Sequence, residues 1–184
     1  MKVLVVCAHG DDEALGCAGV LDKLDCEKDI LIMSTAYIGD EKPTEFAKSV
    51  GAFMISGKFA DNMFDSVPFI ELVQFIEGAG YMPDLILTHY EHDMNIDHQL
   101  TYKAVMTAFR GEPVTIMSFE VACSTGWAFK TFEPNVFIDI DRDRKVELLS
   151  VYDAEMKNHP HPRSYENVKD VERFKLIRGY NCIL

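Results

Sequence analysis

The sequence has 184 residues, 48% of them hydrophobic and 26% charged, a composition typical of a folded domain and unlike that of a disordered chain. Its 18 Lys and Arg against 30 Asp and Glu give a net charge of −12, which disfavours binding to a nucleic-acid polymer or an anionic membrane surface. A chain of this length predicts one domain spanning residues 1–184.

Cysteine usage and apolar runs indicate the compartment. The five cysteines are scattered without a Cys-x-x-Cys pair, which argues against a disulfide framework and against a thiolate zinc site. The apolar run at residues 3–8 is followed at once by His9, Asp11 and Asp12, so it is too short and too acidic for a signal peptide. No run approaches the roughly 20 apolar residues that a membrane span requires. We therefore expect a cytoplasmic protein that does not insert into a membrane.

Apolar runs rich in β-branched residues alternate with helical patterns along the chain. The first run, VLVVCA, is bounded by polar residues, as in a strand that is buried on both faces. Strands are predicted at residues 3–8, 29–35, 52–56, 84–89, 114–120 and 135–140. Helices are predicted at residues 13–24, 43–50, 68–77, 98–110, 144–155 and 165–178. This alternation predicts an α/β, three-layer Rossmann-like fold with a mostly parallel sheet.

Two loops at strand ends hold most of the side chains that can carry chemistry. AHGDDE at Ala8 to Glu13 follows the first strand, and THYEHDMNIDH at Thr88 to His98 follows the fourth. Ligands of such folds bind beyond the carboxyl ends of the strands, so we expect the two loops to meet. His9, Asp12 and a second His from the neighbouring strand end would supply three metal ligands and leave a position for water, as in catalytic zinc sites. Asp11 could reach that water without being a ligand itself.

Each loop taken alone also has an ordinary structural explanation. The carboxylates of Asp11, Asp12 and Glu13 could simply complement the dipole of the helix that follows them. His98 could be an ordinary residue at a helix start. Both loops together, each at a strand end and each rich in His and Asp, favour the metal site.

The two loops resemble a known pair of motifs. AHGDDE is similar to the AHPDDE signature of the LmbE-like, or PIG-L, family of zinc-dependent N-deacetylases, and HDMNIDH is similar to that family's D-x-N-x-D-H motif. Other segments that resemble one branch of the family extend over nearly the whole chain. They are FADNMFDSVP at residues 59–68, EVACSTGW at 120–127, FEPNVFIDID at 132–141 and PHPRS at 160–164.

The resemblance implies a hydrolase that uses Zn²⁺ to remove an N-acetyl group from an amino sugar or a related N-acetylated metabolite. On the matching positions, His9, Asp12 and His98 would be the zinc ligands and Asp11 the general base. Asp97 would support these catalytic groups from behind. The implied partner is a small N-acetylated sugar or sugar conjugate.

The sequence departs from the family pattern in two places. Gly10 stands where Pro is usual, so the turn that holds His9 and Asp12 has one backbone restraint fewer. The chain also stops soon after Arg178, before an acidic and aromatic segment that similar proteins carry. One wall of the cleft could then be missing or supplied by another subunit, so we keep a homo-oligomer among the expected states and leave the substrate range open.

Several further residues are candidates for catalysis or substrate binding. Asn95 stands where some family members have His, and its amide can donate a hydrogen bond but cannot act as a general acid; it could also merely shape the loop. Trp127 could stack on a sugar or simply pack, and Ser124 could bind a hydroxyl or form a turn. Arg163 could pair with a carboxylate or phosphate of the substrate. The predicted substrate-binding set consists of Asp93, Ser124, Trp127 and Arg163.

The leaving amine needs a proton, either returned by Asp11 or supplied by another residue. His161 is the best-placed histidine if the HPHPRS turn folds over the strand ends, and only a surface residue if the turn is remote.

Three rival functions remain open to comparison. The fold could cleave another amide or a thiol-linked sugar, or it could be a non-catalytic sugar-binding module with an inactive metal site. The complete set of His9, Asp11, Asp12 and His98 speaks against the inactive module. A nucleotide-binding Rossmann protein is disfavoured because no G-x-G-x-x-G follows the first strand.

Overall fold

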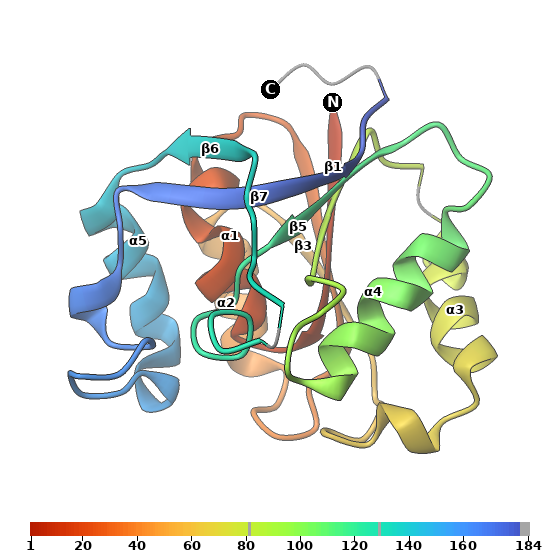
Figure 1. Ribbon diagram of the computed structural model, residues 1–184, viewed down its shortest axis with the longest axis horizontal. Coiled ribbons are helices and arrows are strands. Elements are labelled where there is room, and N and C mark those ends of the chain that lie inside the picture. The colour runs from red at the N-terminus through yellow and green to blue at the C-terminus, as the bar shows by residue number, and fades with distance from the viewer. Residues whose placement is uncertain (81, 129, 181–184) are drawn as a thin grey trace.

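The computed structural model describes residues 1–80, 82–128 and 130–180 (Figure 1). The described strands form one seven-stranded sheet in the order β3-β2-β1-β4-β5-β7-β6. They are β1 (Lys2–His9), β2 (Glu27–Ser34), β3 (Phe53–Ser56), β4 (Leu85–Thr88), β5 (Thr115–Phe119), β6 (Val136–Asp139) and β7 (Val171–Arg178). All pairings from β3 to β5 are parallel, and β7 pairs antiparallel with both β5 and β6. The expected α/β fold with a mostly parallel sheet is confirmed.

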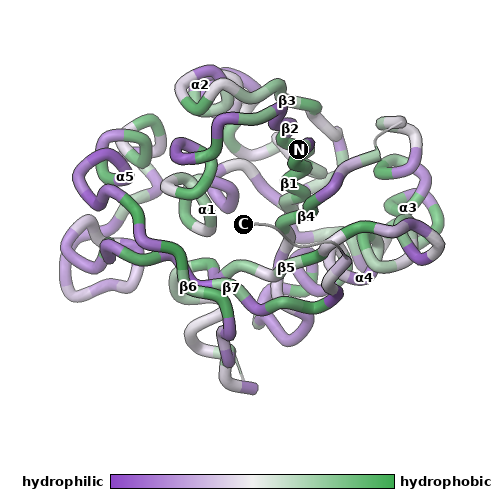
Figure 2. The backbone as a smooth tube through the Cα atoms, turned by 90° about the horizontal axis from the view of Figure 1, so that it is seen from above, coloured by the Kyte–Doolittle hydropathy of each residue, from purple (hydrophilic) through white to green (hydrophobic). Residues whose placement is uncertain are grey.

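In the described part of the chain, five α-helices cover the two faces of the sheet. They are α1 (Asp12–Lys23), α2 (Glu41–Ser49), α3 (Phe69–Gly78), α4 (Ile96–Ala108) and α5 (Arg142–Leu149). Figure 2 shows α1 and α5 on one side of the sheet and α3 and α4 on the other. None of these helices is long and apolar enough to cross a lipid bilayer.

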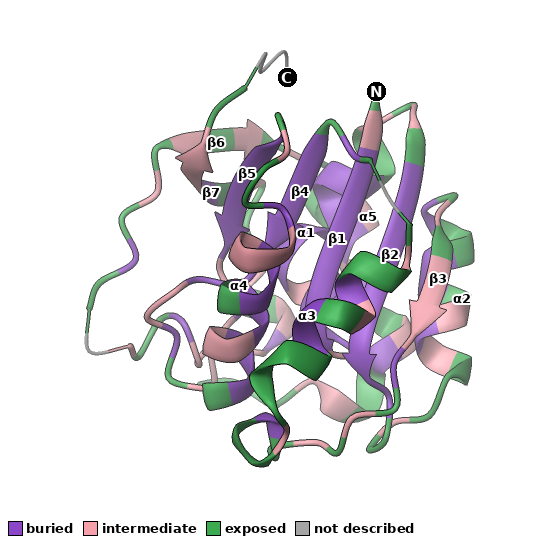
Figure 3. Cartoon of the chain, turned by 90° about the vertical axis from the view of Figure 1, so that its right-hand side faces the viewer, coloured by how far each residue is buried: buried purple, intermediate pink, exposed green. Residues whose placement is uncertain are grey.

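The first strand is buried on both faces, which explains its unbroken apolar run. Val5 and Cys7 belong to the core beneath α1, α2 and α5, whereas Val6 and Ala8 belong to the core beneath α3 and α4. Successive side chains of a strand point to opposite faces, so each core receives every second residue. Figure 3 shows β1 and β4 as buried central strands, with the more exposed β3 and β6 at the two edges of the sheet.

The order of the strands places the two candidate loops side by side. β1 pairs with β2 on one side and with β4 on the other, so the direction in which strands are added reverses between β1 and β4. Val6 lies opposite Thr88 in the parallel register. The residues that follow these two strands therefore share one carboxyl edge, where ligands bind in open α/β sheets.

One predicted element is wrong. Residues 165–178 do not form a helix; they form a short 3-10 turn at Tyr165–Asn167 and then β7. Glu172 and Phe174 of β7 are buried, while Arg173 between them is exposed. Because one inward-facing residue is charged, the period of two is not visible as an alternation of apolar and polar residues.

Glu172 has a specific set of partners at α1. The backbone of Cys17 leaves helical geometry there, with φ −148° and ψ 20°. Just past this kink, Glu172 accepts hydrogen bonds from the backbone N–H groups of Gly19 and Val20 at 2.9 and 2.8 Å. Lys145 of α5 donates to the same carboxylate at 2.7 Å. A buried ion pair thus satisfies backbone groups at the kink and joins α1, α5 and β7.

Candidate metal centre

A pocket of about 210 Å³ opens at the carboxyl edge of the sheet, beyond β1 and β4; we call it the cleft. Both candidate loops line it, through His9, Gly10, Asp11, Asp12, Asn95 and His98. Ser34 at the end of β2 also lines it, as does Arg163. Arg163 belongs to the segment between α5 and β7, which we call the tail. The two loops that the sequence analysis selected therefore meet in one pocket.

Two histidines of the cleft converge on one carboxylate oxygen of Asp12. Asp12 Oδ2 lies 3.4 Å from His9 Nδ1 and 3.2 Å from His98 Nε2. One ligand atom from each of the three residues lies within 4.8 Å of the other two. Two imidazole nitrogens and one carboxylate oxygen at such separations suit a divalent transition-metal ion with an open coordination position. The residues present therefore fit a metal site.

The turn between β1 and α1 sets Asp12 against His9. Asp12 Oδ2 accepts a hydrogen bond from the backbone N–H of His9 at 3.0 Å. Asp11 has a left-handed φ of 100°, a conformation that costs energy for a residue other than glycine. At Gly10, a Cβ atom would lie 2.4 Å from Cδ1 of Ile38. The same Cβ would lie 2.9 Å from Cγ of Pro43, so close packing against Ile38 and Pro43 leaves little room for a side chain at position 10.

Asp97 supports His9 from behind. Its Oδ2 lies 3.0 Å from His9 Nε2, and its Oδ1 accepts a hydrogen bond from the backbone N–H of Phe64 at 3.1 Å. The side chain of Asp97 is fully buried. A carboxylate on Nε2 orients the ring and leaves Nδ1 facing Asp12. The geometry agrees with the supporting role expected for Asp97.

Asp93 stands in the corresponding position behind His98. Its Oδ1 lies 3.2 Å from His98 Nδ1. Asp93 also accepts hydrogen bonds from the hydroxyls of Thr125 at 2.5 Å and Ser124 at 3.1 Å, and from the backbone N–H of Asn95 at 2.9 Å. Only 1% of Asp93 is exposed. This burial favours a positioning role over the predicted contact with substrate.

Electrostatics in the cleft favour cation binding. Burial alone would lower the pKa of His9, but hydrogen bonds to Asp12 and Asp97 raise it to about 10. Burial is likewise outweighed at His98, where the charge of Asp12 raises the pKa to about 9. Burial opposes ionisation of Asp12, yet the charge of His98 and hydrogen bonds with His9 and His98 hold its pKa well below the usual range. The carboxylates thus stabilise positive charge at the place where the ligand atoms meet.

His89, at the end of β4, is a neighbour of the cluster that the sequence analysis did not assign. Its Nε2 accepts a hydrogen bond from the backbone N–H of Ala8 at 2.8 Å, and its ring stacks on His98 with centroids 3.9 Å apart. Burial, and then the charge of His98, lower the pKa of His89 to about 3. A neutral ring is consistent with accepting a backbone hydrogen bond, so His89 ties β4 to β1 beneath the cluster.

Asp11 is paired with a residue from the far end of the sequence. Arg163 Nη1 donates to Asp11 Oδ2 at 2.8 Å. Burial and then the nearby Asp12 raise the pKa of Asp11 to about 7, against the opposing charge of Arg163. Asp11 thus lines the cleft beside the ligand cluster without belonging to it.

Asn95 and Ser124 both line the cleft and also hold its framework. Asn95 is the N-cap of α4, and its Oδ1 accepts a hydrogen bond from the backbone N–H of Asp97 at 2.8 Å. Ser124 donates to Asp93, as described above. The capping contact gives Asn95 the structural role that the sequence analysis left open beside a catalytic one.

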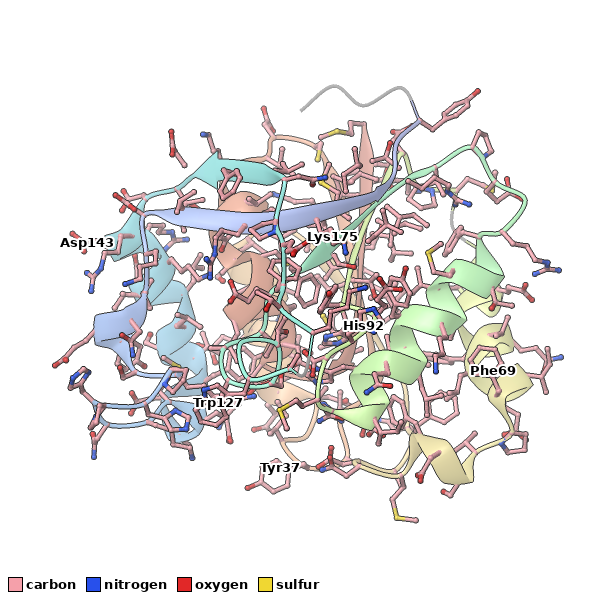
Figure 4. The ribbon with its side chains drawn as sticks, in the orientation of Figure 1. Tyr37, Phe69, His92, Trp127, Asp143 and Lys175 are labelled. Carbon is pink, nitrogen blue, oxygen red and sulfur yellow. The ribbon has the colours of Figure 1, made fainter. Side chains whose placement is uncertain are left out.

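A second pocket of about 500 Å³ lies beside the cleft; we call it the flanking pocket. Trp127, His161 and Arg163 line it, and Arg163 lines the cleft as well. The Trp127 ring is edge-on to His161 with centroids 6.0 Å apart. Figure 4 shows Trp127 on the outside of its loop, close to the loops of the tail. His161 is thus part of the flanking pocket and not of the cleft wall.

Asp61 is a site residue that the sequence analysis missed. Its Oδ1 lies 2.9 Å from His9 Nε2, and it lines the cleft. Together with Asp97 it surrounds this nitrogen with carboxylate oxygens. Asp61 lies in an irregular segment without helical or strand periodicity, so only the similarity of FADNMFDSVP to the family could have drawn attention to it.

Comparisons with known proteins identify the fold. A scan against protein-family models gives no match, and a comparison with curated protein sequences gives none either. Several solved structures match along nearly the whole chain. GalB, the 4-carboxy-2-hydroxymuconate hydratase of Pseudomonas putida KT2440, matches with a TM-score of 0.71 and 16% identity, over 100% of this chain and 99% of that chain.

Two further matches are deacetylases. N,N'-diacetylchitobiose deacetylase of Pyrococcus horikoshii has a TM-score of 0.68 and 16% identity, over 96% of this chain and 83% of that chain. A triple mutant of the deacetylase Orf2 from the teicoplanin biosynthetic pathway has a TM-score of 0.75 and 12% identity, over 95% of this chain and 96% of that chain. At these identities the likeness establishes a shared fold, and that fold carries more than one chemistry.

Proposed function

We propose that this protein is a zinc-dependent hydrolase that removes the N-acetyl group from an amino sugar or a related N-acetylated metabolite. The observation that carries the proposal is the convergence of His9, Asp12 and His98 in a cleft that also contains Asp11. The fold shared with two deacetylases supports the same class of reaction.

The donor set favours zinc among the common divalent ions. Two imidazoles and one carboxylate are typical ligands of catalytic zinc, whereas Mg²⁺ and Ca²⁺ take mainly oxygen ligands. Bound there, zinc would supply a Lewis acid for the acetamide carbonyl and would lower the pKa of water. Asp97 and Asp93 would hold the rings of His9 and His98 in their orientations.

We assign the proton transfers to Asp11. Its carboxylate would take the proton of the attacking water, and Arg163 would hold that carboxylate in place. His161 lines the flanking pocket and not the cleft, which favours Asp11 over His161 as the group that returns the proton to the leaving amine.

A second candidate function is the addition of water to an unsaturated acid. The hydratase GalB shares the fold over the whole chain, and a base beside a divalent metal can activate water for either reaction. A non-catalytic sugar-binding module is a third reading of the same cleft.

An amine-release screen distinguishes these candidates. Zinc-loaded protein is incubated with N-acetylated sugars and nucleotide sugars, and in parallel with unsaturated dicarboxylic acids whose absorbance falls on hydration. We expect equal amounts of free amine and acetate from at least one sugar, with the Asp11→Asn variant as the inactive control. Hydration without amine release would reassign the reaction, and sugar binding without either product would indicate a binding module.

A further inference from the structure

The flanking pocket differs from the rest of the molecule in charge. Four Lys and Arg residues line it, against two carboxylates. The cations are Lys145, Arg163, Lys169 and Arg173, and the carboxylates are Glu120 and Glu172. With neutral histidines the lining is net positive, although the whole chain carries −12. A positive pocket in a strongly acidic protein concentrates anions against the average field.

Three of the four cations have carboxylate partners within the protein, among them Arg163, which is paired with Asp11. Lys145 is paired with Glu172 at 2.7 Å, and Arg173 is paired with Glu120. Lys169 is exposed and forms no ion pair among the described residues. Its charge is therefore available to a ligand.

His161 offers a second available donor. Its Nδ1 accepts a hydrogen bond from the backbone N–H of Arg163 at 3.1 Å, so the proton of the neutral ring lies on Nε2. Within the described part of the chain, Nε2 has no hydrogen-bond partner. An N–H donor at the wall of a positive pocket favours an anionic ligand.

Arg163 connects the flanking pocket to the cleft. It lines both pockets, and its Nη1 is bound to Asp11. A guanidinium has five N–H donors, so one side chain can hold Asp11 and contact an anion together. Trp127, His161 and Lys169 line the flanking pocket together with Arg163, so a ligand that reaches from the cleft past Arg163 would enter among them.

We propose that the flanking pocket binds a carboxylate or phosphate group of the substrate. The substrate would then be an acidic N-acetylated sugar conjugate, with the acetamide in the cleft and the anion near Arg163, His161 and Lys169. The aromatic face of Trp127, which is 60% exposed, covers the sugar between them. This inference rests on the proposed function for the position of the acetamide, but the binding of the anion can be tested without turnover.

The test measures binding by titration calorimetry. The ligands are neutral N-acetylglucosamine, N-acetylglucosamine 1-phosphate and 6-phosphate for the phosphate group, and N-acetylmuramic acid for the carboxylate. The proteins are the wild type, Lys169→Glu and the control Lys103→Glu, which makes the same charge change at an exposed position of α4 outside the pocket. We expect at least one acidic sugar to bind at least about tenfold more tightly than the neutral sugar.

The variants decide whether the pocket is responsible. Lys169→Glu should lose at least about tenfold in affinity for that acidic sugar, and Lys103→Glu should keep it. Equal affinity for neutral and acidic sugars, or equal losses in both variants, would overturn the proposal. Deacetylation of neutral sugars without any preference for acidic ones would leave the proposed function standing and remove this inference. If an acidic sugar binds in a Lys169-dependent way but releases no amine, this inference would stand and the proposed deacetylase function would be overturned.

Discussion

Arg163 donates a hydrogen bond of 2.8 Å to Asp11 across 152 positions of sequence. This contact fixes the carboxylate that we assign as the base at the side of the ligand cluster. It also makes the base dependent on the tail, which carries none of the three proposed metal ligands. The roles of metal binding and proton transfer can therefore be separated by substitution.

Replacing Asp11 with Asn should keep the metal and remove the base. The amide has the same shape and can still accept a hydrogen bond from Arg163, so the turn should survive. We expect turnover to fall by roughly 10²–10⁴-fold, the usual effect of losing a general base. Zinc content per chain and the turnover number are measured on the same preparations. Loss of zinc in Asp11→Asn but not in Asp12→Asn would show that the two roles are exchanged.

Replacing His98 with Ala should release the metal. Asp12 and His9 alone cannot hold the ion in a closed site, so we expect zinc content to fall from about one per chain to a small fraction. The matched control is His92→Ala in the same loop, because His92 is partly exposed and contacts Lys130 outside the cleft. Elemental analysis after dialysis gives the zinc content. Equal zinc in the wild type and His98→Ala would refute the site.

Zinc affinity should rise with pH. In the metal-free protein His9 and His98 have pKa values of about 10 and about 9, so both carry protons at neutral pH. Zinc needs neutral imidazoles, so binding must displace those protons. Between pH 6 and 8 we expect the association constant to increase by about 10- to 100-fold per pH unit. Competition with a chelator of known pH dependence measures it, and an affinity independent of pH would contradict the geometry.

The ion pair at the kink of α1 should be a major source of stability. Glu172→Gln would leave the buried Lys145 without a counter-charge, and we expect a loss of about 3–5 kcal/mol in the free energy of unfolding. Glu77→Gln is the control, since it removes the exposed partner of Arg110 and should cost less than about 1 kcal/mol. Urea denaturation of both variants supplies the comparison. Losses of equal size would mean that the buried pair contributes no more than a surface one.

Gly10 and Ile38 should behave as a coupled pair. Gly10→Ala places a Cβ against Ile38 Cδ1, and we expect a destabilisation of about 1–3 kcal/mol. Ile38→Val removes that atom, so the double variant should lose less stability than the sum of the two single variants. Thermal unfolding of the wild type, the two single variants and the double variant measures these losses. Additive losses would show that Ile38 is not what excludes a side chain at position 10.

The parts of the fold that follow from local pattern could be predicted. The run at residues 3–8 indicated a doubly buried strand because both of its faces are apolar, and the reversal between β1 and β4 then brought His9 and His98 to one edge. β7 could not be predicted, because Glu172 occupies an inward position whose partner, Lys145, comes from another element.

The site shows the same division. His9 ends β1, Asp12 begins α1 and His98 lies in the first turn of α4, so all three belong to the segments that follow β1 and β4 at one edge of the sheet. Asp61 was missed because it reaches His9 from an irregular segment whose path depends on tertiary packing. The burial of Asp93 depends on hydroxyls of the 121–127 loop, which no spacing within its own motif reveals.

The position of β7 also bears on the order in which the protein is completed during synthesis. β6 pairs only with β7 among the described strands, so it cannot join the sheet before residues 171–178 leave the ribosome. His9, Asp12 and His98 all belong to the first 98 residues to leave the ribosome, whereas Arg163 follows 65 residues after His98. A domain generally folds as a unit. The metal ligands and the partner of Asp11 should therefore come together only once the whole sheet, β7 included, is able to form.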